Sequence, residues 1–177
     1  MRVTDKYIFF WDSIYSNWYG CEFSSAGRKF NCSEQNFMYH KALTFGDVET
    51  AEKMMKESHP RVQKKLGKLV KNYDDTTWAE VRYDIMKEAV YLKFSQNKEL
   101  LSELLKTGDK IFVEASPYDT IWGIGMGEDD DLILDEKNWK GLNLLGKALC
   151  EVRAQFIKEL EDEIKYFNRK NNETDTN

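Results

Sequence analysis

The sequence has few of the residues from which small domains build cross-links or metal sites. Its 177 residues include three cysteines, none of them in a C-x-x-C pair, and two histidines. Isolated cysteines in odd number do not form a disulfide framework, and this combination does not match the ligand spacing of a zinc site. We therefore expect a domain without a structural metal, in a reducing, cytoplasmic compartment.

Long apolar runs and a positive net charge are also absent. The apolar stretch that precedes Asp12 is about five residues long, too short for the core of a signal peptide or for a membrane span, so we expect no membrane partner. The formal net charge of −5 excludes a broad surface that neutralises many phosphates. A local basic pocket is compatible with this charge.

The apolar residues that are present follow two periods. Short segments rich in aromatic and β-branched residues predict strands over Tyr7–Trp11, Lys29–Cys32 and Lys110–Ala115. A period of about 3.6 predicts helices that begin at Ser33, after Asp47, at Pro60, at Thr77, at Lys98 and near Leu142. Ser33 is the expected N-cap of the first of these helices, and Thr77 with Glu80 has the spacing of a capping box.

Helices therefore predominate over a small β-sheet, which predicts the α+β class: a single compact, mainly helical domain. We expect this domain to cover residues 1–160, because no linker or internal repeat divides it. Residues 161–177 are mostly polar, and we expect them to form a frayed C-terminal tail.

The first predicted helix places charged residues on an apolar face. At about 100° per residue, the same face carries Glu34, Phe37, Met38, Lys41 and Phe45. An unpaired buried charge is costly, so the carboxylate and the amine each need a partner or a solvent-filled cleft. The alternative is that Glu34 is only a favourable charge at the helix start and that Lys41 extends to water.

A second group of polar residues follows the strand predicted at Lys110–Ala115. The segment VEASPYDTIWGIGMG places Glu114, Ser116, Asp119 and Trp122 near one end of that strand, where binding residues often lie. Gly123 and the glycines after it allow a close backbone approach, but their G-x-G-x-G spacing matches neither the dinucleotide fingerprint nor the P-loop. A flexible loop after an edge strand is the alternative interpretation.

Taken together, the chain resembles the NADAR family, also called YbiA-like N-glycosidases. The resemblance rests on six ordered segments between about residues 9 and 156: FFWDSIYSNWY, FNCSEQNFMYHKALTFGD, KKLGKLV, WAEVRYDIMKEAVYLKFSQN, TGDKIFVEASPYDTIWGIGMGEDD and WKGLNLLGKALCEVR. It implies a small α+β domain that cleaves N-glycosidic bonds without a metal or other cofactor. The implied substrates are small ribosyl phosphates from early riboflavin biosynthesis, or ADP-ribose attached to guanine, including ADP-ribosylated nucleic acid.

The resemblance also implies roles for individual residues. The family's helix-opening Glu and the Lys seven residues later fall on Glu34 and Lys41, and its V-E-A-S-P-x-D-x-x-W-G segment falls on residues 113–123. The implied catalytic residues are Glu34, Lys41 and Asp119. The implied substrate-binding residues are Glu114, Ser116, Trp122, Gly123, Asn143 and Arg153.

We expect six of these side chains to converge on one concave pocket: Glu34, Lys41, Glu114, Asp119, Trp122 and Asn143. A non-catalytic sensor of ADP-ribose or nucleotides is the alternative function, since it would need the same pocket. Because a pure binding domain could lose Glu34 and Lys41 and this chain retains both, the enzyme is favoured.

Overall fold

Six α-helices dominate the part of the chain that the computed structural model describes, residues 1–174, and confirm the predicted α+β class. The helices are α1 (Ser33–Thr44), α2 (Val48–Met54), α3 (Pro60–Gly67), α4 (Asp75–Ser95), α5 (Lys98–Leu105) and α6 (Leu144–Thr174). The strands are β1 (Arg2–Val3), β2 (Tyr7–Phe10), β3 (Phe23–Ser25), β4 (Arg28–Phe30) and β5 (Ile111–Glu114). Two short 3₁₀ helices, Asp131–Leu134 and Glu136–Asn138, lie between β5 and α6.

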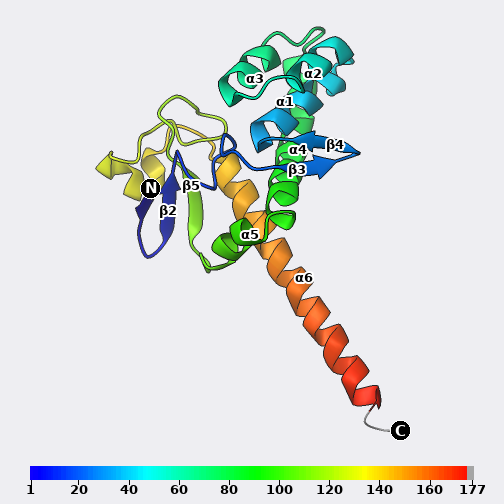
Figure 1. Ribbon diagram of the computed structural model, residues 1–177. Helices are drawn as coiled ribbons and strands as arrows, with labels where there is room; N and C mark the ends of the chain where they lie inside the picture. Colours follow the sequence, from blue (N-terminus) through cyan, green and yellow to red (C-terminus); the bar gives the residue numbers. More distant parts are fainter. Residues whose placement is uncertain (175–177) are drawn as a thin grey trace.

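The strands form two small sheets. In the first, of order β1-β2-β5, β2 pairs antiparallel with β1 and parallel with β5. The β2–β5 register places Phe10 opposite Glu114, so both strands end at the same edge. The second sheet is the β3–β4 hairpin, whose turn residues Ala26 and Gly27 both have positive φ. In Figure 1 the helices α6 and α4 lie between the two sheets, and α1 to α3 gather at the opposite end of the molecule from the C-terminus.

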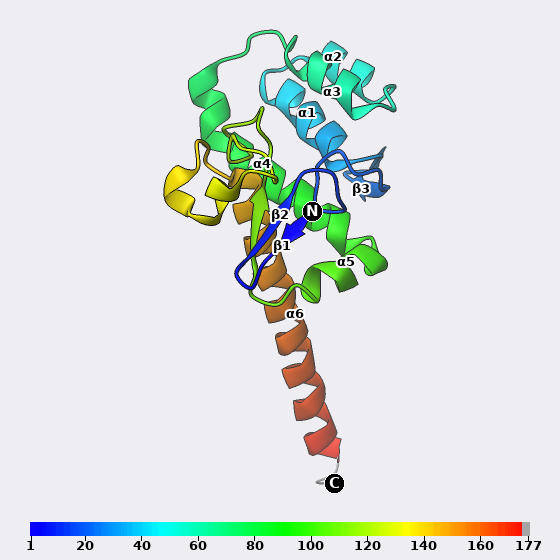
Figure 2. The same ribbon diagram turned by 90° about the vertical axis from the view of Figure 1, so that its left-hand side faces the viewer.

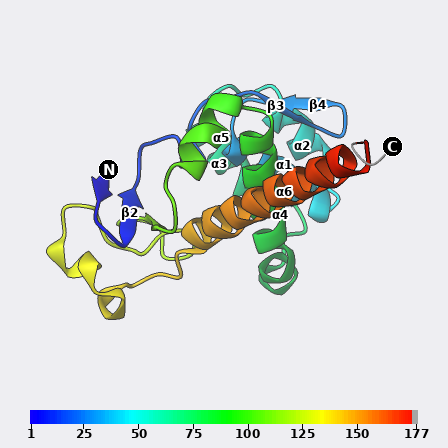
Figure 3. The same ribbon diagram turned by 90° about the horizontal axis from the view of Figure 1, so that it is seen from below.

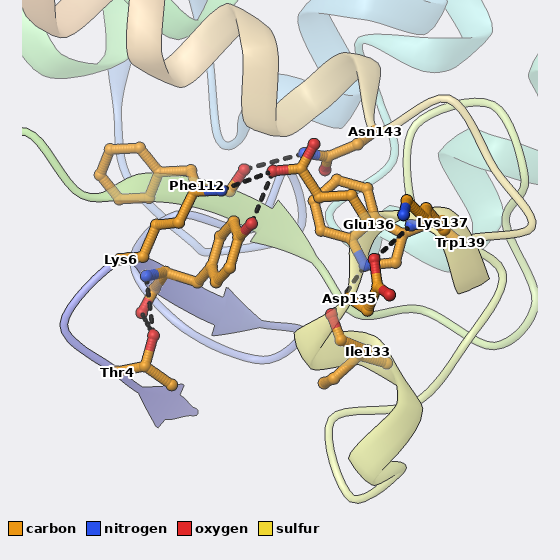
Figure 4. Close-up of polar contacts among 10 residues, drawn as sticks. Thr4, Lys6, Phe112, Ile133, Asp135, Glu136, Lys137, Trp139 and Asn143 are labelled. Carbon is orange, nitrogen blue, oxygen red and sulfur yellow. Dashed lines mark hydrogen bonds and ion pairs between the residues drawn. The ribbon is translucent and has the colours of Figure 1, made fainter.

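The three-stranded sheet separates two apolar cores. Alternate side chains point to opposite faces of a strand, so Phe10 and Phe112 enter the main core with α1, α4 and α6, whereas Phe9 and Val113 enter a smaller one. The smaller core is covered by the segment that leads to α6, where the Trp139 indole donates a hydrogen bond to the Ile133 carbonyl at 2.8 Å (Figure 4). Both faces of β5 are therefore buried, which fixes the position of Glu114 at its end.

Several predicted helix boundaries are wrong by a few residues. Cys32, rather than Ser33, is the N-cap of α1. Helix α4 begins at Asp75, and its cap is Asp74, whose side chain accepts from the Thr77 amide at 2.7 Å. Thr77 is thus a donor in the first turn and not the start of a capping box. The observed cap lies three residues before the expected one, and because Asp and Thr are both favoured N-cap residues, the local sequence is compatible with either start.

The segment expected to form a frayed C-terminal tail is mostly helical. Helix α6 continues to Thr174, so residues 161–174 are helical, and residues 175–177 lie outside the described part. Figure 2 shows that its second half extends away from the other elements, and the view from below in Figure 3 shows α6 in front of α4. None of the helices within residues 1–174 is long and apolar enough to cross a membrane.

Candidate functional site

The apolar and charged face predicted for the first helix lines a cavity of about 230 Å³. Helix α1 contributes Glu34, Phe37, Met38 and Lys41 to its wall. Phe45, the fifth residue of the predicted face, is the C-cap and packs against Tyr73 instead. The helical spacing therefore identified the face that the fold turns toward the cavity.

The end of β5 and the loop after it form the facing wall. Glu114, Asp119 and Trp122 line the same cavity, with the Trp122 ring edge-on to Phe37 at a centroid distance of 5.1 Å. Asp119 Oδ1 accepts hydrogen bonds from the amides of residues 121 and 122, at 2.9 and 2.8 Å, which closes the loop into a tight turn. This turn brings two predicted site residues to the same wall.

A second, wider cavity of about 720 Å³ adjoins this inner cavity, and we call it the outer chamber. The residues that line both spaces are Ser16, Trp18, Lys64, Glu114 and Asp119. Ser116 lines the outer chamber, as do the aromatic side chains Trp11 and Tyr118 and the cation Arg61. The two spaces form one cleft, with acidic side chains where they meet.

Glu34 is in an electrostatically unfavourable position. It is 5% exposed, and its Oε1 has no hydrogen-bond partner among the described residues. Burial raises the pKa of Glu34 to about 7; Asp119 adds to this rise, and Lys64 and a hydrogen bond from the Trp18 indole oppose it. Near neutral pH, Glu34 can therefore either hold or release a proton.

Glu114 shares this property from the opposite wall. The residue keeps partial contact with solvent, but its Oε2 is buried and has no hydrogen-bond partner in the described structure. Desolvation and the nearby charge of Asp119 raise the pKa of Glu114 to about 8. Lys64 lies 3.7 Å from Asp119 Oδ2, so one cation partly offsets three neighbouring carboxyl groups.

Lys41 lies at the rim of the inner cavity beside aromatic rings. Its Nζ is 4.2 Å from the ring centroid of Tyr73 and 5.6 Å from that of Trp78. Burial lowers the pKa of Lys41, while Asp75 and Glu34 act in the opposite direction. An amine in this setting is closer to its neutral form than a surface lysine is, although the rings still favour its charged form.

The comparisons with known proteins agree with this arrangement. The sequence profile of the NADAR domain matches residues 9–157. The chain belongs to the NADAR family. It is 41% identical over 165 residues to N-glycosidase R617 of Acanthamoeba polyphaga mimivirus, covering 86% of this chain and 97% of that protein.

Two further relatives extend the NADAR comparison. The riboflavin biosynthesis protein VVA0006 of Vibrio vulnificus is 27% identical over 159 residues, which cover 87% of this chain and 40% of that protein. The NMR structure of the E. coli protein YbiA matches with a TM-score of 0.72 and 28% identity, over 90% of each chain. The predicted family is therefore confirmed.

Three of the residues implied by the NADAR resemblance lie outside the walls of the cleft. Asn143, at 3% exposure, accepts a hydrogen bond from the Glu114 amide at 2.9 Å. It also donates one to the Phe112 carbonyl at 2.9 Å (Figure 4). Arg153 donates to Thr107 Oγ1 and to the Lys110 carbonyl, at 2.7 and 2.8 Å. Both side chains thus stabilise the fold through these hydrogen bonds, and their binding of substrate stays a prediction.

Gly123 also acts through packing. A Cβ at this position would lie 2.8 Å from the Glu114 carbonyl oxygen and 3.0 Å from that of Asp119. Glycine therefore allows the Asp119 turn to fold back on the end of β5. Gly123 therefore supports the cleft wall, and its contact with substrate stays a prediction.

Local sequence patterns contain little signal for two lysines that shape the cleft. Lys64 belongs to a basic run that also fits a solvated helix face, yet it faces both chambers. Lys93, 1% exposed, donates to the Ser16 carbonyl at 3.0 Å and so holds the segment that leads to Trp18. A lysine two positions before the end of a long helix normally indicates a solvated residue, and only its burial shows this role.

Within residues 1–174, no group of three or more histidine, cysteine, aspartate or glutamate side chains is arranged to hold a metal ion. The side chains that line the cleft include carboxyl groups, amines and aromatic rings.

Proposed function

We propose that this NADAR chain is an N-glycosidase that hydrolyses the C–N bond between a base or amine and a ribosyl phosphate or ADP-ribose. The N-glycosidase class follows from the family and from the name of the mimivirus relative, which matches over nearly its whole length. The name of the Vibrio relative supports a connection with riboflavin biosynthesis. The observation that carries the proposal is the pair Glu34 and Glu114, which line one cavity and each have a carboxyl oxygen without a hydrogen-bond partner in the described structure.

The two carboxyl groups suit the two needs of the reaction. Breaking an N-glycosidic bond develops positive charge on the sugar and negative charge on the departing nitrogen. With its pKa raised to about 8, Glu114 holds a proton at neutral pH and can donate it to the leaving nitrogen. With its pKa near 7, Glu34 supplies a carboxylate that stabilises the sugar cation or accepts a proton from water.

Lys41 supplies a covalent route at the same site. The carboxylic acid donates its proton to the ring oxygen, so the ring opens to an iminium between C1 and the base nitrogen, and the neutral amine adds to C1. A proton then passes from the added amine to the base nitrogen, the C–N bond to the base breaks, and the neutral base leaves. The resulting Schiff base between Nζ and C1 is then hydrolysed by water, which restores the amine and releases the sugar. Support for this role comes from the partial burial of Lys41, its lowered pKa and its place beside Glu34 at the cavity.

The outer chamber supports a substrate that extends beyond the sugar. Its cations Arg61 and Lys64 suit phosphate groups, and the ring of Trp11, 5.9 Å from that of Tyr118, offers a partly exposed aromatic surface. A ribosyl phosphate would use the cations, whereas ADP-ribose would use the aromatic surface as well.

The test compares substrates and variants in one assay. The protein is incubated with a ribosylamino-pyrimidine phosphate and with ADP-ribosylated guanosine, and the released base is measured by chromatography. We expect Glu114→Gln and Glu34→Gln to lower turnover by at least about 100-fold, while Glu151→Gln, on the distant face of α6, retains it. Tight binding of either compound without release of base would instead support the non-catalytic sensor.

A further inference from the structure

The second half of α6 lies outside the enzymatic domain. The NADAR match ends at residue 157, but the helix continues to Thr174. At about 1.5 Å per residue, these 17 additional residues extend roughly 25 Å from the domain. Figures 1 and 2 both show this segment projecting alone. A single helix of this length is only marginally stable in water unless a partner packs against it.

The projecting segment carries an apolar stripe that the domain does not cover. The side chains Ile157, Leu160, Ile164 and Phe167 are 41%, 44%, 60% and 68% exposed. Their spacings of three, four and three residues are those of the a and d positions of a coiled coil. The buried stripe of the same helix, Leu145, Leu149, Val152 and Phe156, ends where this exposed stripe begins.

The charges of the segment indicate what covers the stripe. The half nearest the domain carries four acidic residues and one basic residue: Lys158, Glu159, Glu161, Asp162 and Glu163. The half farther along carries three basic residues and one acidic residue: Lys165, Arg169, Lys170 and Glu173. An antiparallel second copy would place the acidic half of each helix beside the basic half of the other. A parallel copy would place like charges side by side.

The domain itself also favours the antiparallel arrangement. Phe156, directly before the stripe, stacks on Tyr91 of α4 at a centroid distance of 4.8 Å, so α4 already occupies that side of the helix. In a parallel dimer, the part of the partner helix that precedes its stripe would lie in the space that α4 already occupies. We propose that two copies of the chain pair through antiparallel α6 helices, with Ile164 of each packed against Phe167 of the other.

This antiparallel register gives acceptable positions to the helix ends and to the charged residues beside the stripe. It places Thr174 of the second copy opposite Ile157, so the partner helix ends at the edge of the domain. It also places Glu163 of each copy near Lys170 of the other, on the flank of the apolar contact. The cleft, at the α1–α3 end of the molecule, stays open, so pairing leaves turnover unchanged.

Sedimentation velocity of the full chain tests the pairing between about 1 and about 200 µM, the range in which a contact of about two heptads is expected to associate. We expect the wild type to shift from monomer to dimer and Ile164→Gln to remain monomeric with unchanged turnover. Tyr166→Gln is the matched control, because Tyr166 is 58% exposed on the same helix but lies off the stripe, and glutamine adds no charge beside Lys170, whose amine lies over the Tyr166 ring. It should dimerise like the wild type.

A charge exchange tests the orientation. At low salt, Glu163→Lys and Lys170→Glu should each weaken dimerisation by about fivefold or more, and the double variant should restore it. Failure of the double variant to restore dimerisation would overturn the antiparallel register. A wild type that stays monomeric at the highest concentration would overturn the pairing itself, as would a monomer whose stripe binds anionic lipid vesicles instead.

Discussion

Replacing Glu34 with glutamine should make the protein more stable at alkaline pH while it abolishes turnover. The folded state holds the Glu34 proton more tightly than the unfolded state does, because burial raises the pKa of Glu34 from 4.5 to about 7. The free energy of unfolding of the wild type therefore falls as the pH rises through this interval. Glutamine carries no titrating proton, so the Glu34→Gln variant lacks this decrease.

The size of the effect follows from the same two values. The difference between 4.5 and about 7 corresponds to roughly 3 kcal/mol of unfolding free energy, fully lost by the wild type only above the folded-state pKa. Relative to the wild type, the variant should thus gain up to about 3 kcal/mol between about pH 5 and about pH 8. Such a gain marks a group that the fold retains for chemistry at a cost in stability.

Urea unfolding followed by circular dichroism at several pH values measures this gain. Glu151→Gln is the control carboxyl variant: a hydrogen bond from Lys87 lowers the pKa of Glu151, so its replacement should give no gain that grows with pH. If the curves of wild type and Glu34→Gln stayed parallel across this pH range, the buried, proton-holding state of Glu34 would be refuted.

Three further predictions concern residues around the cleft. Lys41→Arg keeps the positive charge but removes the nucleophilic amine, so turnover should drop by at least about 100-fold while ligand affinity is largely retained. Normal turnover of the variant, with no lysine adduct trapped by borohydride in the wild type, would exclude the covalent route. Asn143→Ala should lower the free energy of unfolding by roughly 2 to 4 kcal/mol in urea titrations, because it leaves the Glu114 amide and a strand carbonyl unpaired; unchanged stability would contradict its structural role. Lys93→Met should raise KM about tenfold in steady-state kinetics by releasing the Ser16 carbonyl, and a KM equal to that of the wild type would show that this anchor does not shape the cleft.

The sequence alone determined the features that depend on short-range periodicity. The helical spacing of Glu34, Met38 and Lys41 predicted a shared face, and that face lines the cavity. The strand predicted at Lys110–Ala115 forms at Ile111–Glu114, with the polar residues at its end. Such patterns can be recognised because the geometry of a helix or strand fixes neighbouring side chains without reference to the rest of the chain.

Only the tertiary structure decided which polar groups face the cleft and which are used by the fold. Asn143 and Glu114 are both polar residues in segments that match the NADAR family. The Asn143 side-chain amide forms hydrogen bonds with the backbone of β5, whereas one oxygen of the Glu114 carboxyl group has no hydrogen-bond partner in the described structure. Lys64 and Lys93 both belong to sequences that fit exposed helix faces. Lys64 instead forms an ion pair with Asp119, and Lys93 is buried and donates a hydrogen bond to the Ser16 carbonyl. The partner of a polar side chain is set by segments far away in the sequence, and its burial depends on how those segments pack, which no local pattern contains.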